Sequence, residues 1–223
     1  MARKRYVVVG LGNFGASAAE TLHDLGHEVA ALDLSPNRVD AMGRSVTKAA
    51  VGDGTDADTL RRLGAEDADA AIVSTGGDIT ASALTSLLLR DLGVDSVYVK
   101  VISRHHARLM EKIGVTETIF PERETGIRLG RRISTQVVLN YVPLGPEFGL
   151  QEMAVPPAWV GRSLQDLQLR INRGITVVAV HDMLQDEIQA APDPDAPLKE
   201  SDTLLVAGKE RDLAAISALK NGA

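Results

Sequence analysis

Short apolar runs alternate with amphipathic stretches along the first 120 residues of the chain. The runs are rich in Val, Ile, Leu and Ala, and most of them end close to a Gly, Ser or Pro. Continuous apolar runs separated by helix-length stretches are typical of buried parallel strands joined by crossover helices. The expected strands are residues 6–9, 28–33, 48–51, 70–74, 96–101 and 117–120, and the expected helices are residues 16–25, 56–63, 79–92 and 104–113, with another that starts at Ser35-Pro36.

The pattern of apolar and polar residues changes after Pro121. Residues 122–139 are predicted to form a long linking helix, and a Pro/Gly cluster at residues 143–149 then indicates a domain boundary. Three strand-like runs and a final helix through Leu213 and Ile216 follow this cluster. The runs are residues 151–155, 175–181 and 203–207. We therefore predict an α/β protein with a Rossmann-like parallel sheet over residues 1–140, followed by a small α+β domain over residues 141–223.

Composition excludes several classes of function. The chain of 223 residues carries a formal net charge of −6, which argues against a basic nucleic-acid surface, and we expect no nucleic-acid partner. It has no cysteine, so disulfides, thiolate metal sites and cysteine nucleophiles are excluded. No apolar run approaches the roughly 18 residues that cross a bilayer. We expect a cytoplasmic protein.

The motif that carries chemistry is Gly10-x-Gly12-x-x-Gly15, between an expected strand and an expected helix. In that setting, glycines allow a tight turn, close approach of the backbone to a pyrophosphate, and packing of the helix on the strand. Amides at the start of a helix bind phosphate. Asp33 ends the next strand, where a carboxylate accepts hydrogen bonds from ribose hydroxyls and repels a 2′-phosphate. An adenine nucleotide is the expected ligand.

Three further strand ends should border the same crevice, because ligands of open parallel sheets bind at the carboxyl ends of the strands. Asp53 could accept from an adenine amino group beside Gly54, or form a plain Asp-Gly turn. The segment with Thr75 and Gly76 could pass along the ribose or the phosphates, while Asp78 is expected mainly to cap a helix. Lys100 could meet a phosphate or lie in solvent at the strand end.

Catalytic groups are scarce around this crevice. We expect His105 and His106 to be exposed at the start of a helix, and no substrate domain of useful size remains. Two hypotheses follow: a regulatory protein that senses nucleotide without turnover, or a small NAD-dependent Rossmann oxidoreductase. A hydride transfer would need an acid or base beside the cofactor, which favours the regulatory hypothesis.

These motifs resemble the RCK (regulator of conductance of K⁺) domain, over essentially the whole chain and closest to KtrA/TrkA-like subunits. The N-terminal segments with this resemblance are residues 7–15, 31–33, 52–55, 98–100 and 119–122, and the tail contributes residues 161–164 and 201–204. The resemblance implies a cytoplasmic homo-oligomer, from a dimer up to an octameric ring. It would lie at the inner face of the membrane and dock on a KtrB/TrkH-like potassium channel or transporter subunit. Bound nucleotide would change the ring and gate the pore.

The resemblance also implies roles for single residues. Asp33 would hold the ribose, Arg38 would flank the adenine, and Glu122 would serve an inter-subunit face, where it could bind a divalent cation. The ligand would be ATP or ADP, with NAD(H) as a further candidate. The full set of expected binding residues is Gly10, Gly12, Asn13, Phe14, Gly15, Asp33, Leu34, Arg38, Asp53, Gly54, Thr75, Gly76, Lys100 and Glu122.

Two points depart from the family pattern or stay open. KtrA-like motifs carry an arginine at the position of Asn13, and its loss removes a charge-assisted contact to a γ-phosphate, so the choice among ATP, ADP and NADH is open. In some family members the tail binds cyclic di-AMP. The corresponding residues here are Arg170, Ile171, Asn172, Arg173 and Pro192. We favour surface polar residues around a dimerising sheet, because this segment has no phosphate-binding glycine turn.

Overall fold

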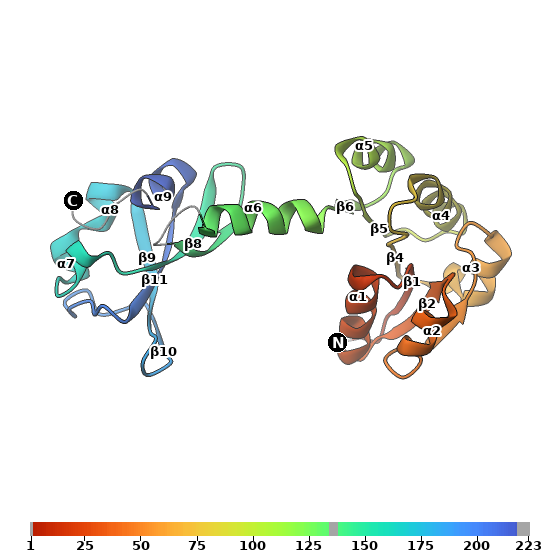
Figure 1. Cartoon of the computed structure of the whole chain (residues 1–223), viewed down its shortest axis with the longest axis horizontal. Helices are drawn as coiled ribbons and strands as arrows, with labels where there is room; N and C mark the ends of the chain where they lie inside the picture. Colours follow the sequence, from red (N-terminus) through yellow and green to blue (C-terminus); the bar gives the residue numbers. More distant parts are fainter. Residues whose placement is uncertain (1, 134–137, 218–223) are drawn as a thin grey trace. The chain divides into compact units, whose positions relative to one another are not determined.

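The computed structural model describes residues 2–133 and 138–217. The chain forms two compact units that divide between Glu122 and Arg123 (Figure 1). Among the described residues, no helix has both the length and the apolar character that a bilayer crossing requires.

A six-stranded parallel sheet forms the centre of the N-terminal unit. The strand order is β3-β2-β1-β4-β5-β6, so successive strands are added on one side of β1 up to β3 and on its other side from β4 onward. The loops after β1 and β4 therefore diverge and leave a crevice. The predicted Rossmann-like sheet is therefore confirmed. The strands are β1 (Arg5–Val9), β2 (Glu28–Asp33), β3 (Lys48–Val51), β4 (Ala70–Val73), β5 (Val97–Lys100) and β6 (Glu117–Ile119).

Helices cover both faces of this sheet because successive residues of each strand point to opposite sides. Val8 packs with residues of α1 (Asn13–Asp24) and α2 (Pro36–Met42) in one apolar cluster. Val7 and Val9 belong to the other cluster, which includes side chains from the remaining helices of the unit. These are α3 (Ala57–Leu63), α4 (Ile79–Asp91) and α5 (Arg104–Ile113), and a short 3-10 helix covers Ala65–Asp67.

Helix α4 differs from its sequence pattern. Leu84 and Leu87, part of the apolar stripe at helical spacing, are 46% and 45% exposed. The buried face carries Leu89 and three hydroxyl residues, Ser82, Thr85 and Ser86. Polar groups can be buried when they are hydrogen-bonded, and Ser86 Oγ does donate to the Ser82 carbonyl at 2.7 Å.

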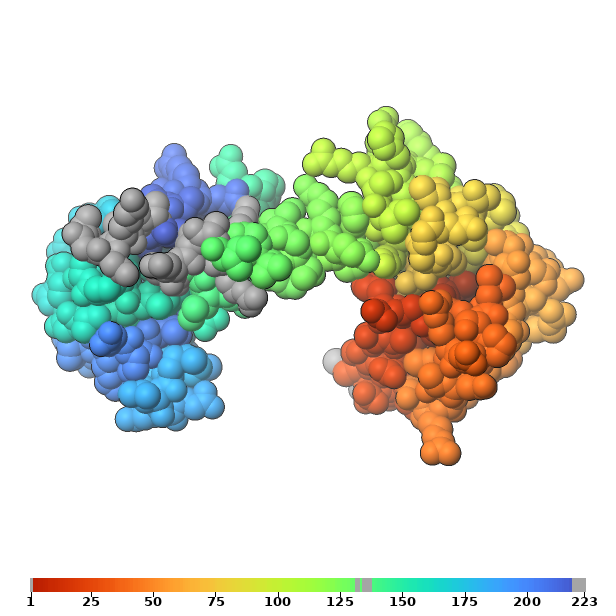
Figure 2. All heavy atoms as spheres, viewed as in Figure 1, coloured from red at the N-terminus to blue at the C-terminus, as the bar shows by residue number. Residues whose placement is uncertain are grey.

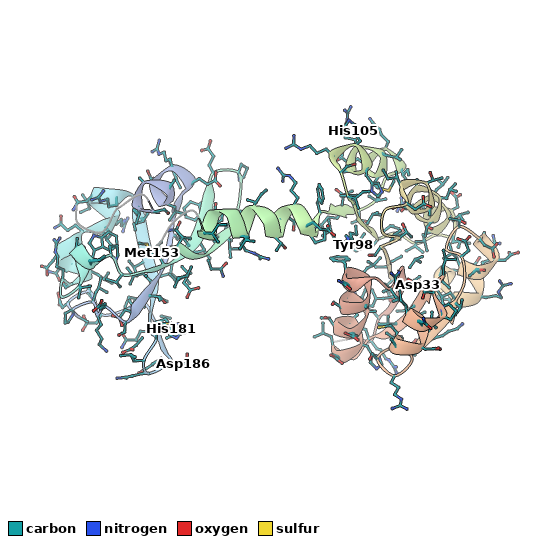
Figure 3. The ribbon with its side chains drawn as sticks, viewed as in Figure 1. Asp33, Tyr98, His105, Met153, His181 and Asp186 are labelled. Atoms are coloured by element: carbon teal, nitrogen blue, oxygen red, sulfur yellow. The ribbon has the colours of Figure 1, made fainter. Side chains whose placement is uncertain are left out.

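The expectation that His106 would be exposed is wrong. His105 does lie on the outer side of α5 (Figure 3), but His106 is only 1% exposed, since α5 packs against α4. Its Nε2 lies 3.1 Å from Ser82 Oγ, and its Nδ1 accepts from the Ile102 amide at 3.4 Å. Burial lowers the pKa of His106, so the neutral imidazole is the form that fits this position.

The C-terminal unit is a five-stranded antiparallel sheet in the order β10-β9-β11-β8-β7, which agrees with the predicted small α+β domain. Met153, Ile175 and Leu204 are fully buried in its core, with Leu213 and Ile216 from the last helix. The strands are β7 (Val138–Pro143), β8 (Phe148–Ala154), β9 (Ile175–Asp182), β10 (Glu187–Ala190) and β11 (Asp202–Lys209), and the helices are α7 (Leu164–Leu167), α8 (Leu169–Arg173) and α9 (Glu210–Ser217), with a 3-10 helix at Pro157–Trp159.

The predicted linking helix over residues 122–139 extends too far. Helix α6 covers Pro121–Ile133, residues 134–137 lie outside the described residues, and Val138 already begins strand β7. Val138 is 6% exposed and pairs with Met153 of β8, so packing in the second sheet overrides the helical pattern. The predicted boundary at residue 140 falls within β7 and stays a prediction.

We expect the buried imidazole to make the N-terminal unit sensitive to acid. The unfolded chain binds a proton on His106 below about pH 6.5, whereas the folded unit resists it, so stability falls as the pH drops from 6.5 through the lowered folded pKa. In thermal unfolding at pH 7.5 and pH 5, His106→Gln should lose less stability than the wild type between these two values. His105→Gln, at the exposed neighbour, is the control and should behave like the wild type. An equal fall in all three proteins would contradict this account.

Candidate nucleotide site

The largest concentration of predicted residues lies around one cavity of about 420 Å³ in the N-terminal unit. The loops that follow β1, β2, β3 and β4 form it, together with the first turns of α4, which is the expected position for a ligand of an open parallel sheet. The lining residues are Val9, Gly10, Gly12, Leu32, Asp33, Leu34, Ser35, Arg38, Gly52, Asp53, Gly54, Thr55, Ser74, Thr75, Gly76, Asp78, Ala81 and Thr85.

Two glycines of the motif are explained by the protein backbone alone. Gly10 has φ of 94°, and a Cβ there would lie 2.2 Å from the carbonyl oxygen of Ser74. A Cβ on Gly15 would lie 1.9 Å from the carbonyl oxygen of Gly10. Both distances are far inside van der Waals contact, so these positions require glycine for the strand–turn–helix unit to close.

Gly12 has a different explanation. Its φ is −70°, which any residue adopts, and a Cβ built on it would meet no atom within 4 Å. Gly12 borders the cavity, so a side chain there would project into space that the chain itself does not fill. Folding does not require this glycine. Close approach of a phosphate to the backbone is the general reason for a glycine at this position of the motif.

The start of α1 is open toward this space. Helices α3, α4 and α5 each begin with a side chain that accepts from the first turn, namely Asp56, Asp78 and Ser103. Helix α1 begins at Gly12 and has no side-chain cap. The first amides of a helix lack acceptors within the helix, and the helix dipole favours an anion beside them. A phosphate group bound at Gly12 would supply the missing acceptor.

Asp33 is held firmly at the end of β2 and is only 7% exposed (Figure 3). Its Oδ2 accepts from the Leu11 amide at 2.6 Å, and its Oδ1 accepts from the Ser35 amide at 2.8 Å. Arg38 Nη1 lies 3.5 Å from the same Oδ2. An ionised carboxylate has about four acceptor positions, so capacity remains for ribose hydroxyl donors.

The other predicted residues in the cavity follow β3 and β4. Asp53 Oδ1 accepts from the Thr55 amide and hydroxyl, both at 2.8 Å, so the expected Asp turn is present and Oδ2 faces no donor among the described residues. Gly54 is fixed by packing, since a Cβ there would lie 2.5 Å from Val9 Cγ1. Asp78 does cap α4, through the Ala81 amide at 2.9 Å. Leu34, Thr75 and Gly76 also line the cavity.

Five predicted residues do not line it, and Gly15, whose close packing is described above, is one of them. Asn13 is exposed and Phe14 is half-buried in the first turn of α1. Lys100, at the end of β5, instead forms an ion pair with Glu122 in the first turn of α6, with Nζ 2.5 Å from Oε1. This hydrogen bond lowers the pKa of the Glu122 carboxyl. The described residues contain no cluster of three potential metal ligands, at Glu122 or elsewhere.

Sequence reasoning missed the contribution of α4. Ala81 and Thr85 line the cavity together with the capping residue Asp78. The signal was available in the spacing, because positions i, i+3 and i+7 share one face of a helix.

Comparison with known proteins identifies the family. Residues 6–121 match the TrkA-N domain, and residues 150–221 match the TrkA-C domain. The chain belongs to the TrkA family. Ktr system potassium uptake protein A of Bacillus subtilis (strain 168) is 33% identical over 210 residues, which cover 94% of each chain. The protein of the same name from Vibrio alginolyticus is 35% identical over 211 residues, 95% of each chain.

Solved structures confirm the fold. The GsuK channel superimposes with a TM-score of 0.70 at 21% identity, over 100% of this chain and 40% of that chain. A GsuK channel structure bound to NAD gives a TM-score of 0.65 at 18% identity, over 96% of this chain and 39% of that chain. The predicted RCK architecture, a Rossmann-like unit followed by a small C-terminal unit, is thus confirmed for this family member.

The residues considered for cyclic di-AMP lie in the C-terminal unit. Arg170, Ile171 and Pro192 line a separate cavity of about 480 Å³ beside β9. Asn172 and Arg173 are not among its lining residues, and Asn172 Nδ2 donates to the Leu167 carbonyl at 3.1 Å. The structure therefore brings together three of the five residues.

The contrast between two glycines gives a direct test of the site. Gly12→Ala should fold normally, because its Cβ has room, but should lose most nucleotide affinity, since the methyl occupies the path of the phosphates. Gly15→Ala should unfold or lose much of its thermal stability. Calorimetry with ATP, ADP and NADH measures the first effect, and circular dichroism measures the second. Undiminished nucleotide binding by a folded Gly12→Ala protein would refute the assignment.

Proposed function

We propose that this protein is a nucleotide-sensing regulatory subunit of a bacterial potassium uptake system. The observation that carries the proposal is the pairing of TrkA-N and TrkA-C domains, in order over nearly the whole chain, with a cavity bordered by Gly12, a glycine whose Cβ position is free of protein atoms. Relatives named as Ktr potassium uptake proteins support this role over an oxidoreductase.

The chemistry of the cavity supports an adenine nucleotide. The open start of α1 would bind the phosphates, Asp33 would accept from the ribose hydroxyls, and Asp53 Oδ2 would accept from the adenine amino group. The buried charge of Asp33 disfavours a 2′-phosphate, which favours ATP, ADP or NAD(H) over phosphorylated dinucleotides. A GsuK structure bound to NAD is in keeping with this range.

Asn13 bears on the choice among these ligands. It lies exposed at the start of α1, where an arginine would place a positive charge next to the phosphates. An amide can donate to a phosphate oxygen, but it adds no positive charge of its own and cannot form the bidentate ion pair that a guanidinium offers. We therefore propose weaker discrimination between ATP and ADP than an arginine at this position would give. A divalent cation at Glu122 would have to replace Lys100 as the partner of that carboxylate.

The proposed mechanism needs no broken bond. A nucleotide that binds one arrangement of the assembled protein more tightly than another shifts the population between them. The acidic residues of the cavity lining, Asp33, Asp53 and Asp78, each accept a hydrogen bond from a backbone amide, which accounts for them without catalysis. We propose that the protein is not an enzyme, and that it acts at the inner face of the cell membrane through a KtrB/TrkH-like subunit.

A homo-oligomer is part of this proposal. On α6, which is coloured green in Figure 2, Ile127, Leu129 and Ile133 are 42%, 45% and 73% exposed. Leu84 and Leu87 of α4 add a second exposed apolar surface. Such surfaces on one chain are typical of interfaces between subunits. We place the apolar faces of α4 and α6 between copies of this chain.

A flux measurement tests the proposed function. The protein is reconstituted with its membrane transporter subunit in liposomes, and potassium flux is recorded without nucleotide and with ATP, ADP or NADH. We expect at least one nucleotide to change the flux severalfold, and Gly12→Ala to remove this response while it still co-purifies with the transporter. A potassium flux that is the same with and without each of the three nucleotides would contradict the proposal. Steady consumption of NADH by the subunit alone would also contradict it.

A further inference from the structure

The side chain of Thr85, in α4, carries a buried hydroxyl group that forms no hydrogen bond with the residues around it. The residue is 0% exposed, and its Oγ1 has no hydrogen-bond partner. Buried polar side chains in folded proteins nearly always have a partner, so an orphan hydroxyl calls for an explanation. Thr85 also borders the cavity, so a bound molecule could reach its neighbourhood.

The helix itself offers Thr85 an easy alternative. Serine and threonine hydroxyls inside helices commonly donate to the carbonyl four residues earlier. Ser86, the next residue of α4, does so to Ser82 at 2.7 Å, and Thr21 of α1 does so to Ser17 at 2.7 Å. Thr85 has no such bond to Ala81. Its hydroxyl is therefore kept off the helix backbone.

Gly54 lies directly beside this hydroxyl. A Cβ on Gly54 would lie 3.1 Å from Thr85 Oγ1 and 2.5 Å from Val9 Cγ1. The loop from Gly52 to Thr55 is thus the immediate neighbour of the hydroxyl, and it carries Asp53, the residue placed next to an adenine amino group. The start of α1 serves the phosphates and Asp33 serves the ribose, so the part of a nucleotide that meets this loop is the base.

We propose that Thr85 reads the base of the bound nucleotide: its O–H donates to a ring nitrogen of a purine that binds against the loop of residues 52–55. The inference rests on the proposed nucleotide site and adds a specificity residue to it. Thr85 is 0% exposed beside Gly54, so entry of the base requires the loop of residues 52–55 to move aside. A pyrimidine is one ring shorter and would not reach it.

Thr85→Val tests ligand recognition separately from folding, because valine keeps the shape of the threonine side chain and removes only the unpaired hydroxyl. We expect its affinity for ATP to fall roughly three- to tenfold, the range of one lost hydrogen bond. The ratio of ATP to UTP affinity, measured by competition against labelled ADP, should fall by the same factor. The melting temperature without ligand should stay equal or rise, because no bond is lost in the free protein.

Two variants serve as matched controls. Thr85→Ser keeps the hydroxyl and should keep the preference for ATP, while Ser86→Ala removes the neighbouring buried hydroxyl and should leave ATP binding unchanged. The inference is overturned if Thr85→Val binds ATP like the wild type, if ATP and UTP weaken equally, or if the free variant melts lower. A wild-type protein that binds no nucleotide would instead refute the proposed function itself, which is a distinguishable result.

Discussion

Close backbone packing at the glycine turn is the constraint on which the rest of the N-terminal unit depends. Gly10 lies against the carbonyl of Ser74 and Gly15 lies against the carbonyl of Gly10, each with no room for a Cβ. This contact joins the end of β1, the start of α1 and the end of β4. The carboxylate of Asp33 adds the end of β2 to the same point through the Leu11 amide. The cavity is the space left between these fixed ends.

Three features around the cavity share one property: each leaves a space or a polar group that a bound ligand would fill or pair. The start of α1 has no side-chain cap, the space beside Gly12 would admit a Cβ but holds none, and Thr85 Oγ1 is buried without a partner. The uncapped helix start and the unpaired hydroxyl each cost the protein some stability; the phosphates of a nucleotide would complete the first and its base would complete the second. A protein whose binding site is completed by its ligand is stabilised by that ligand, which suits a sensor.

The sequence predicted the parallel sheet well because its strands are buried on both faces and therefore form continuous apolar runs, as in Val7-Val8-Val9. It also predicted half of the cavity's lining, since nine of the fourteen expected residues are among its eighteen lining residues. It failed where tertiary packing overrides periodicity. Val138, in the range expected to be helical, pairs instead with Met153 of β8, and α4 buries hydroxyls while it exposes Leu84 and Leu87. The pairing of Lys100 with Glu122 depends on a contact between segments distant in sequence.

Native mass spectrometry of the purified full-length protein tests the central claim most directly, because it reports the number of subunits and any retained nucleotide in one spectrum. The account predicts an oligomer of two or more chains whose subunits carry the added mass of an adenine nucleotide, or gain it when ATP, ADP or NADH is supplied. A monomer that takes up none of these nucleotides would contradict it.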